Sequence, residues 1–350
     1  MSSTGDVSPA STRTLRFAAG ARPAIRGETS AERSGPRWRS PLPTRQHWRH
    51  ADRTFHAVVL GFALSTLAIT ALIGVMLFEK SALSREEFGW AFVWKSSWDP
   101  VAMRFGALPF IYGTLASSVI ALVIAVPLGI GAAICLAELL PRERSDPLAF
   151  LVELLVAVPS VVYGLVAVFV LVPLVRAIGG PVEAVLGWLP VFSGPVYGIG
   201  LLTAGIILAV MIVPFIVSIS REVLLAVPQT QRDAALALGA TRWETVWKVV
   251  LPYARSGIIG SIFLALARAL GETMAVTMVI GNRPEIAASL FAPAYSMAAV
   301  LANEFAEATD ALYVSALIEI ALVLFAITIV VNAGARLLIM TAERRGSRHA

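Results

Sequence analysis

The chain has 350 residues, of which 57% are hydrophobic and 15% are charged, and its mean hydropathy is +0.77. This composition is typical of a protein that crosses a membrane several times, and it excludes an ordinary soluble globular domain. The formal net charge of +5 comes almost wholly from arginine, because lysine occurs only at positions 80, 95 and 248.

The first 54 residues are polar, contain several prolines and carry ten arginines. They lack the apolar residues needed for a core, so we expect residues 1–54 to be a disordered basic tail. The charged stretch is too long for a cleavable signal peptide. Such a tail can bind nucleic acid or anionic lipid, but we interpret it as a cytoplasmic extension that fixes orientation, and we expect no nucleic-acid partner.

Apolar segments long enough to cross a bilayer follow the tail, and the first of them would extend about 36 Å as a helix. They lie near residues 55–78, 112–140, 148–175, 196–220, 257–280 and 311–340. Prolines at 127, 159 and 214 fall inside three of them, where they kink a membrane helix rather than abolish it. The predicted fold is all-α, a polytopic bundle of six transmembrane helices over residues 55–342, followed by a basic tail, 343–350.

Positive charge gathers on the side of the membrane that alternation assigns to both termini. The two tails and the loops 141–147 and 221–256 carry most of the arginines, whereas the loop 281–310 has one arginine against four acidic residues. The positive-inside rule therefore predicts that both termini and the 221–256 loop are cytoplasmic.

The longest polar interruption between two apolar spans, residues 228–252, carries ordered local signals. Residues 229–238 contain no glycine or proline and favour a helix. Gly239 is suited to end that helix, and Thr241 followed by Glu244 predicts a capping box that opens a second one. We expect the closing proline to end this second helix before the next span begins.

This segment resembles the EAA loop of the membrane subunits of bacterial ABC importers. The residues at that family's spacing are Asp233, Ala234, Ala235, Gly239, Val249, Leu251 and Pro252. Asp233 stands where glutamate is usual and Val249 where isoleucine is common. In that family the loop forms a coupling helix that docks into a cleft of the ATPase. The resemblance therefore implies that Asp233, Ala234, Ala235, Gly239, Leu251 and Pro252 couple this chain to an ATPase.

Arg268 and Glu272 lie within the apolar segment 257–280, and their spacing of four would place them on one helix face. Arginine is costly in hydrocarbon, so this face should line the bundle interior or a water-filled cavity. The planar guanidinium binds oxyanions well. The alternative is a buried ion pair that holds the helix in register. Glu153 and Glu319 are weaker candidates as partners of Arg268.

The sequence around this pair resembles the C-type permease subunits of the Pst phosphate ABC importers. The resemblance rests on residues 268–276, 280–282, 193–200 and 301–305 and covers about 55–342. It implies a type I ABC importer permease fold in the bacterial inner membrane, with Arg268 and Glu272 on the phosphate path. It also implies three kinds of protein partner: a homologous sister permease, two ATP-binding subunits and an external phosphate-binding protein.

No phosphate-cradling GxxxxGK[ST] loop occurs in the sequence, so the ATPase must be another polypeptide. We see no catalytic triad, zinc-ligand spacing or dinucleotide fingerprint, and we expect no enzymatic activity, cofactor or metal. A permease for molybdate or sulfate, or the sister A-type phosphate subunit, stays open. A membrane enzyme acting on a lipid phosphate would need a general base or metal ligands near Arg268, where only Glu272 is available.

Overall fold

The computed structural model describes the backbone of residues 45–346 and the side chains of residues 53–340. The chain divides into two units, residues 1–63 and 64–350. Helix α1 (Arg45–Lys80) begins in the first unit and continues into the second. It starts inside the segment expected to be a disordered tail, and the rest of that segment, 1–44, lies outside the described residues, as does 347–350.

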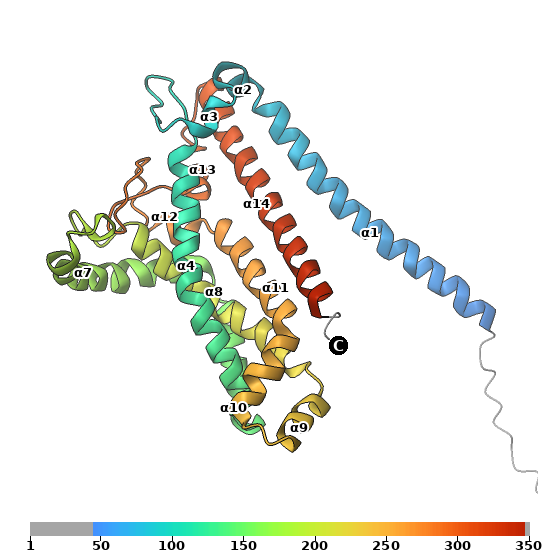
Figure 1. Cartoon of the computed structure of the whole chain (residues 1–350). Helices are drawn as coiled ribbons and strands as arrows, with labels where there is room; N and C mark the ends of the chain where they lie inside the picture. Colours follow the sequence, from blue (N-terminus) through green and yellow to red (C-terminus); the bar gives the residue numbers. More distant parts are fainter. Residues whose placement is uncertain (1–44, 347–350) are drawn as a thin grey trace, which may run out of the picture. The chain divides into compact units, whose positions relative to one another are not determined.

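The second unit is built from helices, and the described residues contain no β-strand (Figure 1). Its helices are α2 (Ala82–Phe88), α3 (Ala91–Trp94), α4 (Leu108–Ile134), α5 (Arg142–Val156), α6 (Ser160–Val166), α7 (Val172–Leu186), α8 (Leu201–Leu225), α9 (Gln229–Ala237), α10 (Arg242–Thr245), α11 (Leu251–Leu270), α12 (Met274–Thr277), α13 (Met297–Glu304) and α14 (Ala311–Gly346). A short 3₁₀ turn, η3 (Pro190–Phe192), follows α7. Three π-helical turns extend or join these helices: η1 (Cys135–Leu139), η2 (Ala167–Leu171) and η4 (Val246–Val250).

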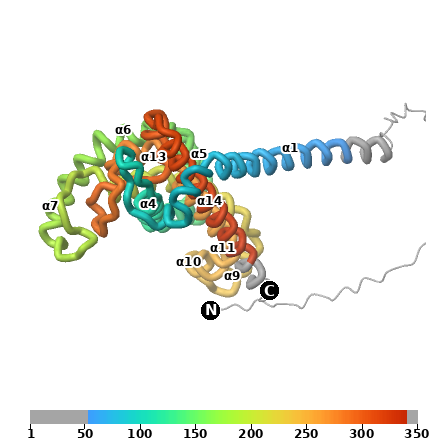
Figure 2. The backbone as a smooth tube through the Cα atoms, turned by 90° about the horizontal axis from the view of Figure 1, so that it is seen from above, coloured from blue at the N-terminus to red at the C-terminus, as the bar shows by residue number. Residues whose placement is uncertain are grey.

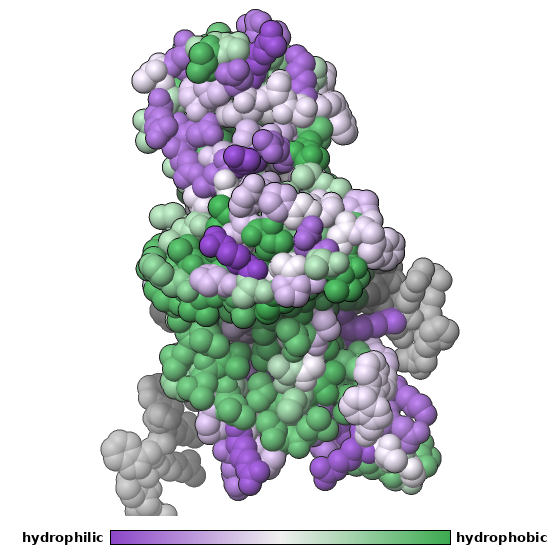
Figure 3. Space-filling view, turned by 90° about the vertical axis from the view of Figure 1, so that its left-hand side faces the viewer, coloured by the Kyte–Doolittle hydropathy of each residue, from purple (hydrophilic) through white to green (hydrophobic). Residues whose placement is uncertain are grey.

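Six stretches of the described chain are long and apolar enough to cross a membrane. They are Arg53–Lys80, Leu108–Leu139, Ser160–Leu186, Leu201–Leu225, Arg242–Leu270 and Ala311–Met340. On the face seen in Figure 3, apolar residues form a belt between polar ends of the second unit. The predicted all-α fold with six membrane helices is confirmed.

The predicted third span, 148–175, is wrong. Helix α5 ends at Val156, and Pro159 stands in an extended conformation before α6. A proline restricts the residue before it and cannot donate to the preceding turn, so the chain breaks here instead of kinking. The 15 residues of α5 reach only about 22 Å, too short to span the bilayer, and the spanning helix is Ser160–Leu186.

The fourth span begins at Leu201, not near residue 196, because Gly198 and Gly200 have φ values of +84° and +153°. These values lie outside the right-handed helix and suit only glycine. The segment before α8 instead pairs with the segment after α12: the N–H of Gly200 donates to the carbonyl of Val279 at 2.9 Å.

The second helix of the 228–252 loop does not end at Pro252. A continuous helix runs from Arg242 through the π-helical turn η4 into α11, and Pro252 stands in the first turn after η4. Proline removes one hydrogen bond and crowds the carbonyl four residues earlier. The wider π turn relieves that crowding, so the fifth span starts on the polar loop itself.

Helices α4 and α8 pack together along their lengths and form the centre of the main apolar cluster. Gly129 and Gly205 lie at this contact, where a Cβ would collide with Ile216 and Ile120 respectively. Small residues at such contacts let membrane helices approach closely, as the sequence predicts. Figures 1 and 2 show α7 lying apart from α11 and α14, and α9 close to α10.

Candidate functional site

The predicted coupling segment forms a short helix, a tight turn and the start of the fifth span. Gly239 ends α9 with φ +88°, and its N–H donates to the carbonyl of Leu236 at 3.0 Å. The capping box forms as predicted: the Glu244 N–H donates to Thr241 Oγ1 at 3.2 Å, and the Thr241 N–H donates to Glu244 Oε2 at 3.0 Å. The glycine cap and the capping box both depend on residues close together in the chain, so the sequence alone predicts them.

Arg232 fastens α9 to the rest of the second unit. Its Nη2 lies 2.7 Å from Glu138 Oε1 in η1, and its guanidinium also donates to the backbone carbonyls of Leu224, in the last turn of α8, and Val227, just after α8. Only 12% of the Arg232 side chain and 10% of the Glu138 side chain are exposed. Such a shielded, multiply bonded pair fixes the angle at which α9 leaves the bundle.

The motif residues do not all share one surface. Asp233, Ala234 and Gly239 are exposed, whereas Ala235 is half-buried. Leu251 is half-buried and packs against the apolar cluster under the loop, and Pro252 is exposed beside the π turn. The exposed members are therefore available to a partner, and Leu251 contributes to the support of the loop.

Apolar residues that sequence reasoning missed stand on the same end of the molecule. Leu238, at the tip of the turn after α9, is 90% exposed. Trp243 and Trp247 are more than half exposed, with ring centroids 5.5 Å apart. The sequence could have predicted that Leu238 is exposed, because this residue stands just before Gly239, where the helix ends and the side chain turns outward. These exposed apolar side chains are candidates for contact with a partner protein.

Arg268 lies in the last turn of α11, and its side chain is exposed. Its guanidinium carbon is 5.8 Å from the centroid of the Phe215 ring. Among residues 53–340 the structure gives it no ion pair within 4.0 Å. Leu264, one turn earlier on the same face, is 51% exposed. This face of α11 is therefore not covered by the described helices of its own chain.

Glu272 does not share a helix face with Arg268, so that prediction is wrong. Helix α11 ends at Leu270 with Gly271 as its cap, and Glu272 lies in the connection to α12. There its carboxylate accepts from the N–H of Ala275 at 3.3 Å. Glycine at a helix end favours termination, which the four-residue spacing does not reveal. The alternative of a buried Arg268–Glu272 ion pair is also wrong.

The two weaker carboxylate candidates lie elsewhere. Glu319 in α14 is buried and accepts a hydrogen bond from Ser84 Oγ in α2. Glu153 is exposed on α5, outside the spanning helices. Neither pairs with Arg268. No group of three or more His, Cys, Asp or Glu side chains that could hold a metal ion occurs in the described part of the chain.

The opposite end of the second unit is held by a polar and aromatic cluster. Trp98 Nε1 and the Tyr313 hydroxyl donate to Glu304 Oε2 at 2.9 and 2.7 Å. Asn303 donates to the Tyr295 hydroxyl at 3.1 Å. Burial, with a smaller contribution from Glu304, raises the pKa of Tyr295 to about 12, so this hydroxyl stays neutral at physiological pH. The cluster ties the loops on this side to α14.

Comparisons with known proteins identify the family of this chain. Residues 125–340 match the family described as "Binding-protein-dependent transport system inner membrane component". The phosphate transport system permease protein PstC of Mesorhizobium japonicum is 46% identical over 299 residues, covering 84% of this chain and 91% of that protein. PstC of Pasteurella multocida is 46% identical over 294 residues, covering 82% and 91%. An inward-facing structure of the MetNI methionine ABC transporter has a TM-score of 0.48 and 18% identity, over 68% of this chain and 94% of that chain.

Proposed function

Because the chain belongs to the family of binding-protein-dependent transport system inner membrane components, we propose that it is a permease subunit of an ATP-driven importer of inorganic phosphate. The observation that supports phosphate as the substrate is the 46% identity to a phosphate transport permease across 84% of the chain. Six apolar helices of spanning length fit a multi-pass membrane subunit.

The α9 loop is the proposed contact with the ATPase. Asp233, Ala234 and Gly239 are exposed, Leu238 projects from the tip, and Arg232 holds the helix from behind. A docked partner can move the fifth span through this loop, because α10, η4 and α11 are one continuous helix. A charged or bulky side chain at Gly239 should uncouple ATP hydrolysis from transport.

The Arg268 face is the proposed anion route. A guanidinium without an ion pair among residues 53–340 is available to bind a phosphate oxyanion in two parallel hydrogen bonds. Its exposure in a spanning helix fits a face completed by a second, homologous permease subunit. Glu272 lies just beyond the end of α11, where its carboxylate can accept from a protonated phosphate.

The remaining partners follow from the family and from the sequence. By its family the importer would contain two ATP-binding subunits, and an external phosphate-binding protein would deliver the substrate. The ATP-binding subunits would be separate polypeptides, because this sequence has no phosphate-cradling loop. We place the chain in the bacterial inner membrane with both termini and the α9 loop in the cytoplasm, which the distribution of arginine supports.

An uptake assay tests the identity of the substrate. It uses the complete importer, reconstituted with its two ATPases, its sister permease and its binding protein. We expect ATP-dependent accumulation of labelled phosphate that excess sulfate or molybdate does not reduce. Accumulation that sulfate or molybdate suppresses would assign the chain to another oxyanion. Phosphate uptake that persists with a Gly239→Asp chain, at an unchanged ratio of ATP hydrolysed to phosphate moved, would contradict the role of the α9 loop.

A further inference from the structure

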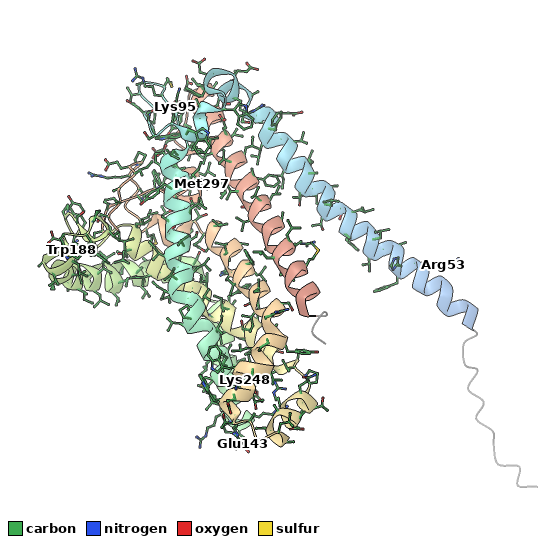
Figure 4. All side chains as sticks on the ribbon, in the orientation of Figure 1. Arg53, Lys95, Glu143, Trp188, Lys248 and Met297 are labelled. Carbon is green, nitrogen blue, oxygen red and sulfur yellow. The ribbon has the colours of Figure 1, made fainter. Side chains whose placement is uncertain are left out.

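A cavity of about 560 Å³ opens at the end of the second unit that carries the α9 loop. Figure 4 labels Glu143 and Lys248 at this end. The walls of the cavity are formed by η1, the start of α5, the end of α8, α9 and α10. On α9 the lining residues are Gln229, Arg232 and Leu236, which share one helix face, while the exposed Asp233 and Ala234 are not among them. The cavity therefore lies beside the proposed docking surface, and Gln229 connects the two because its Nε2 donates to Asp233 Oδ1 at 3.1 Å.

The cavity has an excess of positive charge. Four arginines line it against two carboxylates, and the lining contains no lysine. The charged lining residues are Arg142, Arg221, Arg232, Arg242, Glu138 and Asp146. Both carboxylates are already neutralised: Arg232 lies 2.7 Å from Glu138, and Arg221 lies 2.6 Å from Asp146. The lining residues alone therefore have a formal charge of +2, and Glu222, outside the lining, also lies 3.2 Å from Arg221.

Arg142 and Arg242 supply this excess. Their side chains are exposed, and the structure gives neither of them an ion pair within 4.0 Å among residues 53–340. They come from different elements, the first turn of α5 and the first turn of α10, so the fold brings together two guanidinium groups that are 100 positions apart in the sequence. An anion in the cavity would be attracted by both positive charges.

Arg221 adds a largely buried positive charge to the wall of the cavity. Only 11% of its side chain is exposed, and its Nε is buried without a hydrogen-bond partner, the one side-chain atom of this kind among the described residues. Its Nη2 also lies 3.4 Å from Ser145 Oγ, a second polar group of the lining. Its Nη2 and Nη1 pair with Asp146 and Glu222, and its Nε is too deeply buried to contact an anion in the cavity. Arg221 therefore contributes positive charge to the wall, and the exposed arginines are left to bind a ligand directly.

We propose that this cavity binds a phosphate-bearing anion, with Arg142 and Arg242 as the main ligands. Guanidinium forks match the tetrahedral oxygens of phosphate, and the volume is in the range of small-molecule sites. The lining contains no aromatic side chain on which a nucleotide base could stack, so a compact group fits better. Two sources supply this chemistry: free inorganic phosphate and the headgroup of an anionic phospholipid. The proposal rests on the charge of the cavity and not on the transport function.

The test uses the full chain, purified in detergent, with the Arg268→Ala substitution present throughout so that the proposed transport route contributes no binding. Inorganic phosphate is titrated calorimetrically into this chain and into the same chain carrying Arg142→Gln and Arg242→Gln. Retention of phosphatidylglycerol is measured in parallel by native mass spectrometry after incubation with mixed phosphatidylglycerol and phosphatidylcholine. Arg283→Gln, an exposed arginine in the loop after α12, is the matched control.

We expect the double substitution to lower the affinity for one of the two ligands at least tenfold, whereas Arg283→Gln should leave that affinity unchanged. Weaker binding of inorganic phosphate identifies a free-anion site, and loss of phosphatidylglycerol retention identifies a lipid site. Equal binding of both ligands by all variants, or no binding by the unsubstituted cavity, would overturn the proposal. Unfolding temperatures should stay the same, because the structure gives neither side chain an ion pair among residues 53–340. Arg142→Lys with Arg242→Lys should bind more weakly than the arginines but more tightly than the glutamines, because an ammonium keeps the charge and lacks the fork.

Discussion

The α9 loop and the Arg268 region are both organised by an arginine, but the two arginines are held in opposite ways. Arg232 is almost buried, paired with Glu138 and bonded to two backbone carbonyls. Arg268 is exposed and has no ion pair among the described residues. The first arginine completes a structure within one chain, and the second leaves its charge available. A buried paired charge supports architecture, whereas an unpaired one in a spanning helix is costly unless it serves a ligand or partner.

The largest expected effect concerns the unpaired arginine. Arg268→Ala in the complete importer should lower phosphate uptake by about 100-fold, because hydrogen bonds to charged groups contribute about 1.5–3 kcal/mol. Stability should change little, since among residues 53–340 the side chain has no ion pair and only the contact with the Phe215 ring, and the complex should still assemble. Labelled phosphate uptake and co-purification measure the two quantities, with Arg283→Ala as the control. Wild-type uptake would remove Arg268 from the mechanism.

At the paired arginine, Arg232, we expect a substitution to lower the stability of the chain. Arg232→Ala should lower the free energy of unfolding by about 3 kcal/mol, because it leaves the Glu138 carboxylate buried without a partner. Coupled ATP hydrolysis should fall as well, because α9 loses its fixed angle. Adding Glu138→Gln should recover part of the stability. An Arg232→Ala chain that unfolds at the wild-type temperature would show that the pair does not hold α9.

A smaller effect is expected at the tip of the loop. Leu238→Ala should weaken binding of the ATPase about tenfold, as loss of roughly 1.4 kcal/mol of apolar burial requires. The unfolding temperature should stay the same, since this leucine is 90% exposed in the isolated chain. Val101→Ala, at a residue that is 95% exposed in the loop before α4, is the matched control for ATPase affinity. Equal affinity of both variants would place the docking contact elsewhere.

The smallest expected effect is on stability at Gly239, where the cost of backbone conformation can be measured apart from the cost of packing. Gly239 has φ +88°, and no neighbouring atom lies within 4 Å of the position that a Cβ would take, so Gly239→Ala should cost only the conformational penalty of about 1 kcal/mol. Gly131→Ala, where a Cβ also meets open space but the glycine lies inside α4, should instead stabilise the chain by about 0.5–1 kcal/mol. Denaturant unfolding of both variants measures the difference, and the same sign for both would contradict the turn at Gly239.

Local signals predicted the α9 loop well. The cap at Gly239 and the box of Thr241 and Glu244 depend on residues three or four apart, so the sequence contains the whole interaction. Hydropathy likewise predicted six spans, and the last one, Ala311–Met340, has the predicted bounds. Span boundaries near Pro159, Gly200 and Gly271 were wrong, because one residue can break, delay or end a helix without changing the hydropathy around it.

The sequence by itself determined the class of protein, the number of spans, and the residue types at both sites, because burial in a bilayer demands long apolar helices and local caps need only near neighbours. Tertiary structure alone decided which charges are paired. Glu138 meets Arg232 across 94 positions, Glu272 leaves the helix that carries Arg268, and Arg142 reaches the same cavity as Arg242. Such contacts depend on how helices pack, and pairing rather than residue type separates a structural arginine from one that can bind an anion.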